Sequence, residues 1–437
     1  MATERLDLVV SLEGASPIMW RARADRASVS FSSEGEPQAR LVLHGAGPPV
    51  DLQRLRFTAA LTQNARARSV TLQADLPVEG VRLVKSFEVS RESYELVMTV
   101  RLLGPGAAAF MAGRRFDVEL AAGRGLSPVP AAGFAAMLDR VSRVDVGGGA
   151  GDWTGYRNRF WAILMRRADD PERLTWRYTF YSGPVEERAL TRVDPALRQL
   201  LFSGLWSWLR ALSWALLFLL RGLTAVVGHP GVAIIALAVS VKLLLLPLTL
   251  VAERLQRNVD ATQARLQPGI DAIKAAYRGE ERARRTLALY RAEGVHSLYT
   301  LKSLLGVAIQ LPVFVAVFDM LAEDFDLHGV SFLWLRDLSR PDALLRLPGC
   351  VPFFGCDLNL LPFLMAGVSL ATLLRFRSPV LTPPLVRRQR RNLSAMTVLF
   401  FLLFYTFPAG MVLYWTSTNG VQLVGQELGR LRFWRSR

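Results

Sequence analysis

The sequence predicts an α-helical membrane bundle preceded by an all-β sandwich domain. Hydrophobic residues make up 51% of the chain. They form short alternating segments before residue 200 and long uninterrupted runs after it. The first long run, residues 231–252, contains one charge, Lys242, and about 20 apolar helical residues cross the roughly 30 Å hydrocarbon layer of a bilayer. A buried helix of a soluble protein would explain one such run, but three more follow. We therefore expect two domains, residues 1–200 and 201–437.

Residues 1–200 have the pattern of β-strands. Several segments alternate or are rich in β-branched and aromatic residues, and turn sequences such as GAGPP separate them. This pattern is typical of an antiparallel β-sandwich. The segments are residues 6–12, 69–74, 82–89, 94–102, 160–165 and 174–182. The region has a single histidine, His44, and no carboxylate pair at a defined spacing, so it gives little support to sugar chemistry.

Residues 203–226 are apolar and rich in tryptophan. At helical spacing, Arg210, Trp214 and Arg221 fall on one face, together with Ser203, Ser207 and Leu217. Indole rings suit the boundary between membrane and water. We expect a helix that lies in this interface, and the alternative is an ordinary span with arginines near its ends.

Lys242 lies near the middle of the first membrane run. A lysine at mid-membrane costs about 2.5–3.5 kcal/mol on insertion scales, and such residues usually face a polar cavity or a partner. The alternative is that the side chain snorkels to the headgroups. We favour a water-filled cavity because the ammonium lies far from either surface.

A polar helical hairpin is expected at residues 253–298. Apolar residues recur there at helical intervals, Gly279 interrupts the pattern, and Gly294 ends it. The hairpin is either a plain solvated structure or a docking element for a partner.

Four further spans complete the expected set of five. The runs predict spans at about residues 304–321, 358–374, 393–407 and 410–428, with Phe407-Pro408-Ala409-Gly410 dividing the last two. Gln310 lies in the second span, and the last carries Thr416, Ser417, Thr418 and Asn419. Such polar groups also serve to bond neighbouring helices.

The net charge of +16 suggests an anionic partner or the bias of cytoplasmic loops. The segment between the third and fourth spans contains only basic charges, and the loop before it is largely acidic. The positive-inside rule therefore places the hairpin, the arginine segment and the C-terminus in the cytoplasm, and the β domain outside. The arginines are Arg375, Arg377, Arg387, Arg388, Arg390 and Arg391. Beyond setting topology, they are candidates for contact with the ribosome or anionic lipid, in a loop that its prolines keep extended.

Seven motifs, in order, resemble the YidC/Oxa/Alb family of membrane protein insertases, in its bacterial form with a periplasmic domain. They are Lys242 before Pro247-Leu248-Thr249, Leu266-Gln267-Pro268, Ala288-Leu289-Tyr290-Arg291-Ala292-Glu293, Ile309-Gln310-Leu311-Pro312-Val313-Phe314, Leu335-Arg336-Asp337-Leu338-Ser339, Phe407-Pro408-Ala409-Gly410 and Val412-Leu413-Tyr414. Tyr156-Arg157-Asn158-Arg159-Phe160 extends the likeness into the β region.

The resemblance implies a hydrophilic groove that receives polar parts of nascent membrane proteins in the bacterial inner membrane, alone or with the Sec translocon. The groove residues it implies are Lys242, Gln310, Trp415, Thr418 and Asn419. Lys242 stands where the family usually has arginine, so the charge is kept without the guanidinium fork. The first residues contain no long apolar run and no visible signal peptide, although the resemblance implies a span before the β domain.

No enzymatic chemistry is expected. The sequence has no phosphate-binding glycine loop and no cluster with metal-ligand spacing, so we expect no cofactor, no metal and no recognition of a specific nucleic-acid sequence. The alternative is a membrane-bound enzyme or transporter whose β domain binds a glycan. Cys350 and Cys356 are predicted to form a disulfide in an outer loop, and two free thiols are the alternative.

Overall fold

The computed structural model describes the chain except for residues 33–36, 46–49, 64–66, 122–125, 127–132, 148–151, 171, 296–304, 353, 376–382 and 436–437. It divides into two compact units. The β unit comprises Met1–Gly204 and Ala322–Gly329, and the helical unit comprises Leu205–Leu321 and Val330–Arg437. A β-sandwich followed by a helical region is thus confirmed.

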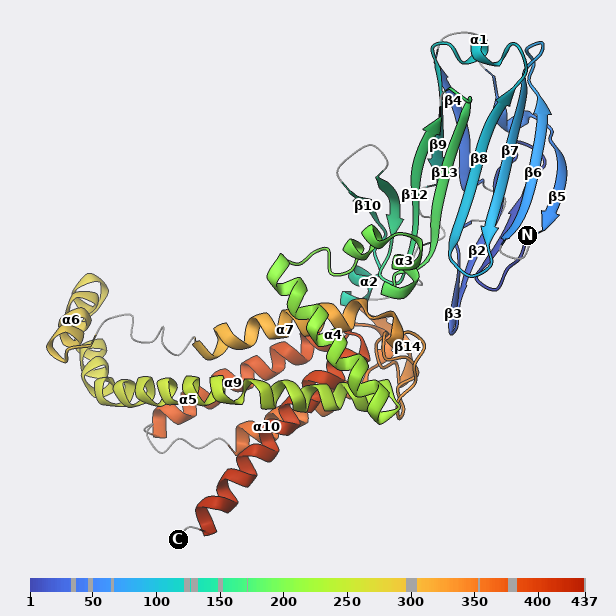
Figure 1. Cartoon of the computed structure of the whole chain (residues 1–437). Coiled ribbons are helices and arrows are strands. Elements are labelled where there is room, and N and C mark those ends of the chain that lie inside the picture. The colour runs from blue at the N-terminus through green and yellow to red at the C-terminus, as the bar shows by residue number, and fades with distance from the viewer. Residues whose placement is uncertain are drawn as a thin grey trace. The chain divides into compact units, whose positions relative to one another are not determined.

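The β unit is built around an eight-stranded antiparallel sheet (Figure 1). Its strands, in spatial order, are β10 (Ser142–Val146), β11 (Trp153–Arg157), β12 (Trp161–Asp170), β13 (Thr175–Pro184), β8 (Glu95–Leu103), β7 (Arg82–Ser90), β6 (Ala67–Asp75) and β5 (Thr58–Gln63). All six segments predicted as strands form strands, because a period of two directs every second side chain to one face.

Two smaller sheets cover the inner face of the large one. They are β1 (Leu6–Val10), β2 (Pro17–Ala24) and β3 (Ala27–Ser30), and β4 (Ala39–Gly45) with β9 (Arg114–Leu120). Trp20 joins the first to the large sheet, because its Nε1 donates to Ser182 Oγ at 2.9 Å and its ring meets Phe180 edge-on at 5.3 Å. Phe116 and Trp176 make the matching contact for the second, at 4.8 Å.

Short helices complete the β unit. Among the described residues they are α1 (Ala107–Met111), α2 (Gly133–Leu138), α3 (Glu187–Val193) and the 3₁₀ turns at Leu52–Arg54, Pro195–Leu200 and Phe325–Leu327. The Asp194 carboxylate begins the second turn by accepting the Ala196 N–H at 2.8 Å and the Trp153 Nε1–H at 2.9 Å. One side chain therefore fixes the end of the domain to the large sheet.

Arg157 and Glu323 attach the segment Ala322–Gly329 to the β unit. Arg157 Nη2 donates to Glu323 Oε1 at 2.7 Å, and the Phe202 N–H donates to Glu323 Oε2 at 2.7 Å. The Arg157 side chain is 9% exposed and that of Glu323 17%. Phe325 adds an edge-on contact with Trp161 at 5.5 Å. The motif at residues 156–160 is thus a structural anchor within this unit.

The helical unit consists mainly of long apolar helices and one short polar helix, α6. Its helices are α4 (Ser207–Val227), α5 (Pro230–Ala276), α6 (Gly279–Ala292), α7 (Leu305–Glu323, whose last two residues belong to the β unit), α8 (Leu360–Leu374), α9 (Pro383–Phe404) and α10 (Ala409–Arg435). A two-stranded hairpin, β14 (Leu345–Val351) and β15 (Gly355–Leu358), precedes α8. By length and composition, α4 and α5 could cross a membrane, and α8 is a shorter apolar helix.

Helix α5 continues without a break from the first membrane run into the polar hairpin (Figure 1). It spans 47 residues and contains Pro247 and Pro268. Gly279, at φ +58°, marks the turn into α6, and an added Cβ at Gly269 would lie 3.0 Å from Leu289. The hairpin arms therefore pack closely where glycine replaces a side chain. Residues 296–298 of the predicted hairpin lie outside the described residues.

Helix α4 begins at Ser207 rather than at residue 203. Its buried residues are Leu209, Ser213, Leu216, Leu217 and Leu220. Ser213 Oγ donates to the Ala316 carbonyl of α7 at 3.1 Å. The stripe predicted to contain Arg210 therefore lies beside the packed face of α4. Ser203, which was predicted to belong to the stripe, precedes the helix.

Candidate substrate groove

Helix α5 places Lys242 three turns from its N-terminus. The helix starts where His229 Nδ1 accepts the Gly231 N–H at 3.0 Å and Pro230 occupies the first turn. Gly231 packs against Phe332, since an added Cβ would lie 2.3 Å from that ring. The start of α5 is therefore fixed, and with it the position of Lys242 along the helix.

Lys242 lies at the border between two faces of α5. The packed face consists of Ala233, Ile234, Leu237, Ala238 and Val241. Leu243 and Leu244 are exposed, and Lys242 is half-buried. Glu253 follows eleven residues later on the same helix. Eleven residues are about three helical turns, so Lys242 and Glu253 share one face of α5, and this spacing could have been found in the sequence.

Trp415 on α10 lies in an aromatic cluster. Its ring centroid is 5.2 Å from Phe314 of α7, 5.4 Å from Phe400 of α9 and 5.5 Å from Phe404 of α9. Three helices thus meet around one half-buried indole. Aromatic pairs in such arrangements contribute about 0.5–1.5 kcal/mol each beyond their buried area.

The polar residues of α10 make different contacts. Asn419 Nδ2 donates to Ser369 Oγ of α8 at 2.9 Å. Thr418 is buried, one turn after the buried Tyr414. Thr416 and Ser417 donate to carbonyls of their own helix at 2.7 Å. Of these four polar residues, Asn419 is the one whose side chain bonds a neighbouring helix.

One loop holds the N-termini of α8 and α10 together. The carbonyls of Leu338 and Arg340 accept the N–H groups of Gly410 and Ala409 at 2.8 and 2.7 Å. Asp342 Oδ2 accepts the Leu361 N–H at 2.6 Å. First-turn N–H groups of a helix have no partner within the helix, and a carboxylate also suits the positive end of its dipole. The motif at residues 335–339 and the Phe-Pro-Ala-Gly motif are thus connected directly by backbone hydrogen bonding.

The five candidate groove residues lie on α5, α7 and α10. Helix α10 packs against both α5 and α8, and Gln310 is half-buried on α7. Within the described residues, no hydrogen bond joins Lys242 to Gln310, Trp415, Thr418 or Asn419. A common groove for these side chains therefore stays a prediction. Ser369 and Asp342 were missed because their partners are distant in sequence.

The predicted extended arginine loop is wrong for residues 383–391. Helix α9 begins at Pro383, because proline fits the first turn of a helix, where its missing N–H costs nothing. Arg387, Arg388 and Arg391 are exposed on α9, and Arg390 Nη2 donates to the Leu374 carbonyl at 3.4 Å. Arg375 pairs with Glu427 of α10 at 2.9 Å, and Arg377 lies outside the described residues.

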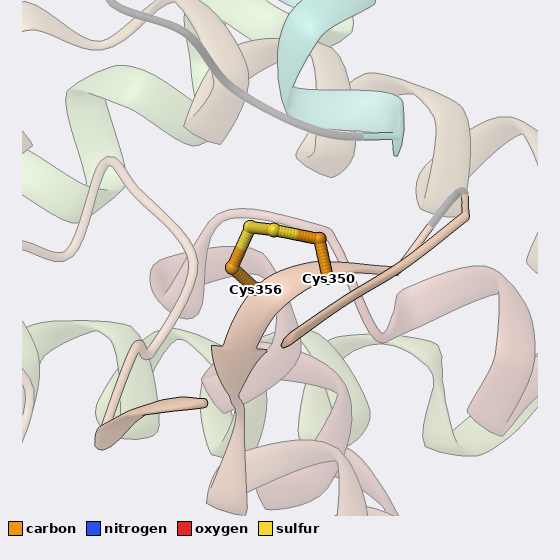
Figure 2. Close-up of a disulfide and its surroundings, with 2 residues drawn as sticks. All are labelled: Cys350 and Cys356. Atoms are coloured by element: carbon orange, nitrogen blue, oxygen red, sulfur yellow. A yellow bond between two sulfur atoms is a disulfide. The ribbon is translucent and has the colours of Figure 1, made fainter. Parts of the chain in front are cut away.

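The cysteines are paired. Figure 2 shows the disulfide between Cys350 of β14 and Cys356 of β15.

In the β unit, a pocket of about 410 Å³ lies at the β6–β7 turn, where Asp75, Glu79 and Arg82 contribute charge. Asp75 pairs with Arg82 at 2.7 Å. Within the described residues, no group of three His, Cys, Asp or Glu side chains could hold a metal.

Known proteins resemble this chain chiefly in the helical unit. Residues 222–432 match the family described as 60Kd inner membrane protein. A membrane protein insertase YidC of Ralstonia nicotianae is 32% identical over 249 residues, covering 56% of this chain and 40% of the relative. The helical part of this chain is similar to the YidC insertases. One YidC of Chlamydia caviae is 30% identical over 271 residues, covering 58% of this chain and 33% of the relative.

The matches to these YidC relatives span less than half of their length. A solved structure titled as an active YidC insertase with its first transmembrane domain resolved aligns with 97% of this chain and 90% of its own, at 19% identity and a TM-score of 0.38. The helices α5, α7, α8, α9 and α10 all lie within or overlap the family match. The YidC likeness therefore covers the elements that carry the candidate groove.

Proposed function

We propose that this chain inserts newly made proteins into a bacterial inner membrane and assists their folding. The observation that carries the proposal is Lys242, a half-buried cation on a helix whose neighbouring side chains are leucines. Buried polar groups without partners cost several kcal/mol each in lipid. A fixed positive charge offers acidic or polar client segments a partner on their way across the bilayer. Insertion of this kind needs no covalent chemistry.

The groove would be formed by α5, α7 and α10, with Lys242, Gln310, Trp415 and Thr418 facing the client. Glu253 refines this proposal, because its carboxylate lies on the same face of α5 as Lys242 and would compete with an acidic client for the ammonium. We expect α5, α7, α8, α9 and α10 to form the five spans. Helix α4 would lie in the membrane interface, as the exposed Trp206 and Trp208 near its start support.

The orientation follows from charge. The exposed arginines of α9 and the polar α6 favour a cytoplasmic location for these elements, which leaves the β unit outside. Proposed partners are nascent membrane proteins, the Sec translocon, the ribosome and anionic lipids. These assignments extend the names of the relatives to this chain.

Substitution of Lys242 tests the proposal. In cells depleted of their own insertase, protease protection of client tails measures insertion. Lys242→Arg should keep most activity, whereas Lys242→Ala should lose insertion of clients with acidic translocated tails and retain clients with short neutral tails. Leu244→Ala, at the exposed face beside it, serves as the control and should behave as wild type. Equal rescue of acidic-tailed clients by Lys242→Ala and wild type would reject the groove charge.

Glu253→Gln adds a second arm to this experiment. Removal of the competing carboxylate should leave insertion of acidic-tailed clients unchanged or improve it. The paired variant Lys242→Ala with Glu253→Gln should resemble Lys242→Ala alone, because the cation that both effects require is gone.

A further inference from the structure

The hairpin formed by β14 and β15 exposes apolar side chains. All seven residues of β14 are exposed, among them Leu345 at 58%, Leu347 at 37% and Val351 at 49%. The opposite strand is half-buried, and its neighbour Phe354 meets Tyr405 edge-on at 5.2 Å. Strand β15 therefore faces the neighbouring helices of its own unit, and strand β14 is exposed to the surroundings of the protein.

Charge in this hairpin is confined to its base. Arg346 and Asp357 are opposite each other in the register, and opposite charges at such positions favour pairing of the strands. Beyond them, residues 347–355 contain no charged residue. An uncharged tip of leucine, valine, proline and phenylalanine is thus presented on a charged base.

The disulfide closes this tip. Cys350 and Cys356 are joined across the turn that contains Val351 and Gly355 (Figure 2). A closed loop has fewer conformations to lose when it contacts another surface. The cross-link therefore favours a persistent apolar surface over a collapsed or frayed loop.

The hairpin leads directly into an apolar helix. Strand β15 ends at Leu358 and α8 begins at Leu360, with Phe363 and Leu364 exposed in its first two turns. The 15 residues of α8 are about 22 Å long at 1.5 Å per residue. This is shorter than the roughly 30 Å hydrocarbon layer, so the apolar surface of α8 alone does not fill the layer.

We propose that the disulfide-closed hairpin inserts its apolar tip into the interfacial layer of the lipid bilayer and extends the short apolar surface of α8. The proposal rests on the assignment of α8 as a span in the proposed function. Lipid is the expected occupant because the exposed surface of the hairpin continues into the exposed side chains of a membrane helix. Mismatch between helix and bilayer costs free energy that such an extension reduces.

The backbone limits the depth of insertion. The outer edge of β14 has no partner strand among the described residues, and unpaired backbone groups are not tolerated in the hydrocarbon region. The tip therefore lies about 5–10 Å into the boundary of headgroups and acyl chains. Arg346 and Asp357 remain at the level of the headgroups, where the long arginine side chain can reach water.

Depth-dependent fluorescence quenching tests this inference. The full chain is reconstituted into phosphatidylcholine and phosphatidylglycerol vesicles, with an environment-sensitive fluorescent amino acid in place of Leu347. Brominated acyl chains quench from the lipid side and iodide quenches from water. Leu287 of α6, exposed to 39% against 37% for Leu347, is the matched control on a polar helix. We expect lipid quenching and protection from iodide at 347, and the reverse at 287.

Two outcomes would overturn the inference. Iodide access at both positions would show that the tip is in water, and protection from iodide without lipid quenching would show that protein covers it. The paired variant Cys350→Ser with Cys356→Ser should reduce lipid quenching at 347. Unchanged quenching would reject the proposed role of the disulfide in holding the tip in the bilayer. Insertion of an acidic-tailed client in the same vesicles separates the two proposals. An active insertase with an aqueous tip refutes only this inference, and an inactive one with a lipid-buried tip refutes only the proposed function.

Discussion

Asn419 on α10 donates a hydrogen bond from its side-chain amide to the hydroxyl of Ser369 on α8, at 2.9 Å. The same two helices are also joined at their N-termini, where Asp342 accepts the Leu361 N–H and the Leu338 carbonyl accepts the Gly410 N–H. Two separate sites therefore fix the register of α8 against α10. Trp415 and Thr418 lie on α10 on the N-terminal side of Asn419, so this register sets their position.

The Asn419–Ser369 bond should contribute measurably to stability. Hydrogen bonds between membrane helices contribute about 0.6 kcal/mol on average and up to about 2 kcal/mol. Asn419→Ala and Ser369→Ala should each cost that amount in denaturant unfolding in detergent, and the double variant little more than one alone. Thr397→Ala, whose hydroxyl donates to its own helix at 3.0 Å, is the control. Fully additive costs would show that the two side chains act independently.

The Arg157–Glu323 pair should anchor the segment after α7 to the β unit. Loss of one partner leaves a buried charge uncompensated and costs about 3–5 kcal/mol. Glu323→Gln should therefore speed hydrogen exchange at the Phe202 amide, which donates to Glu323 Oε2. Asp75→Asn, which breaks the exposed pair with Arg82, should leave that exchange rate unchanged. Equal rates in Glu323→Gln and wild type would contradict an anchoring role.

Lys85 should make the stability of the β unit depend on pH. It is fully buried, its Nζ donates to the carbonyl of Gly14 at 2.7 Å, and burial lowers the pKa of Lys85 from 10.5 to about 7. Between these values the unfolded chain binds a proton that the folded chain has lost. The free energy of unfolding therefore rises with pH from about 7 to 10.5, by at most about 1.4 kcal/mol per pH unit.

Comparison of wild type with Lys85→Met checks this dependence. Below pH 7 the lysine is charged in both states and the burial cost is fully present, so the variant should gain most there. Denaturant unfolding of the full chain at several pH values, monitored by hydrogen exchange of the β7 amides, gives the slope of the free energy of unfolding against pH. A wild-type slope that persists in Lys85→Met would assign it to other groups.

The exposed arginines of α9 should bind an anionic partner. Replacement of Arg387, Arg388 and Arg391 by glutamate should reduce co-sedimentation of the nanodisc-embedded chain with ribosomes, most strongly at low salt, because exposed charges are screened. Replacement by lysine keeps the charge and should retain most binding. If the glutamate variant sediments as wild type does, the ribosome is not the partner. In that case two explanations remain, contact of the arginines with anionic lipid and an effect of the arginines on topology alone. Fluorescence quenching by anionic lipid at these positions distinguishes the two.

The local elements of this chain were predictable from sequence because their signals are local. Alternation over six to ten residues fixes a strand, and a long apolar run fixes a membrane helix. The start of α9 was missed because Pro383 and Pro384 were interpreted as keeping a loop extended, whereas the structure uses them in the first turn of the helix. The shared face of Lys242 and Glu253 on α5 needed only a count of three helical turns.

The environment of Lys85 is determined partly by the local sequence and partly by the tertiary structure. By itself the sequence determines that Leu83, Lys85 and Phe87 share one face of β7, because side chains alternate along a strand, and that face is buried. Only the tertiary structure supplies the Gly14 and Ala15 carbonyls that accept from Nζ. They lie some seventy residues earlier in the chain, and no local pattern encodes a contact at that separation. The same holds for Asn419 with Ser369, because packing of two helices, and not the sequence of either, brings donor and acceptor together.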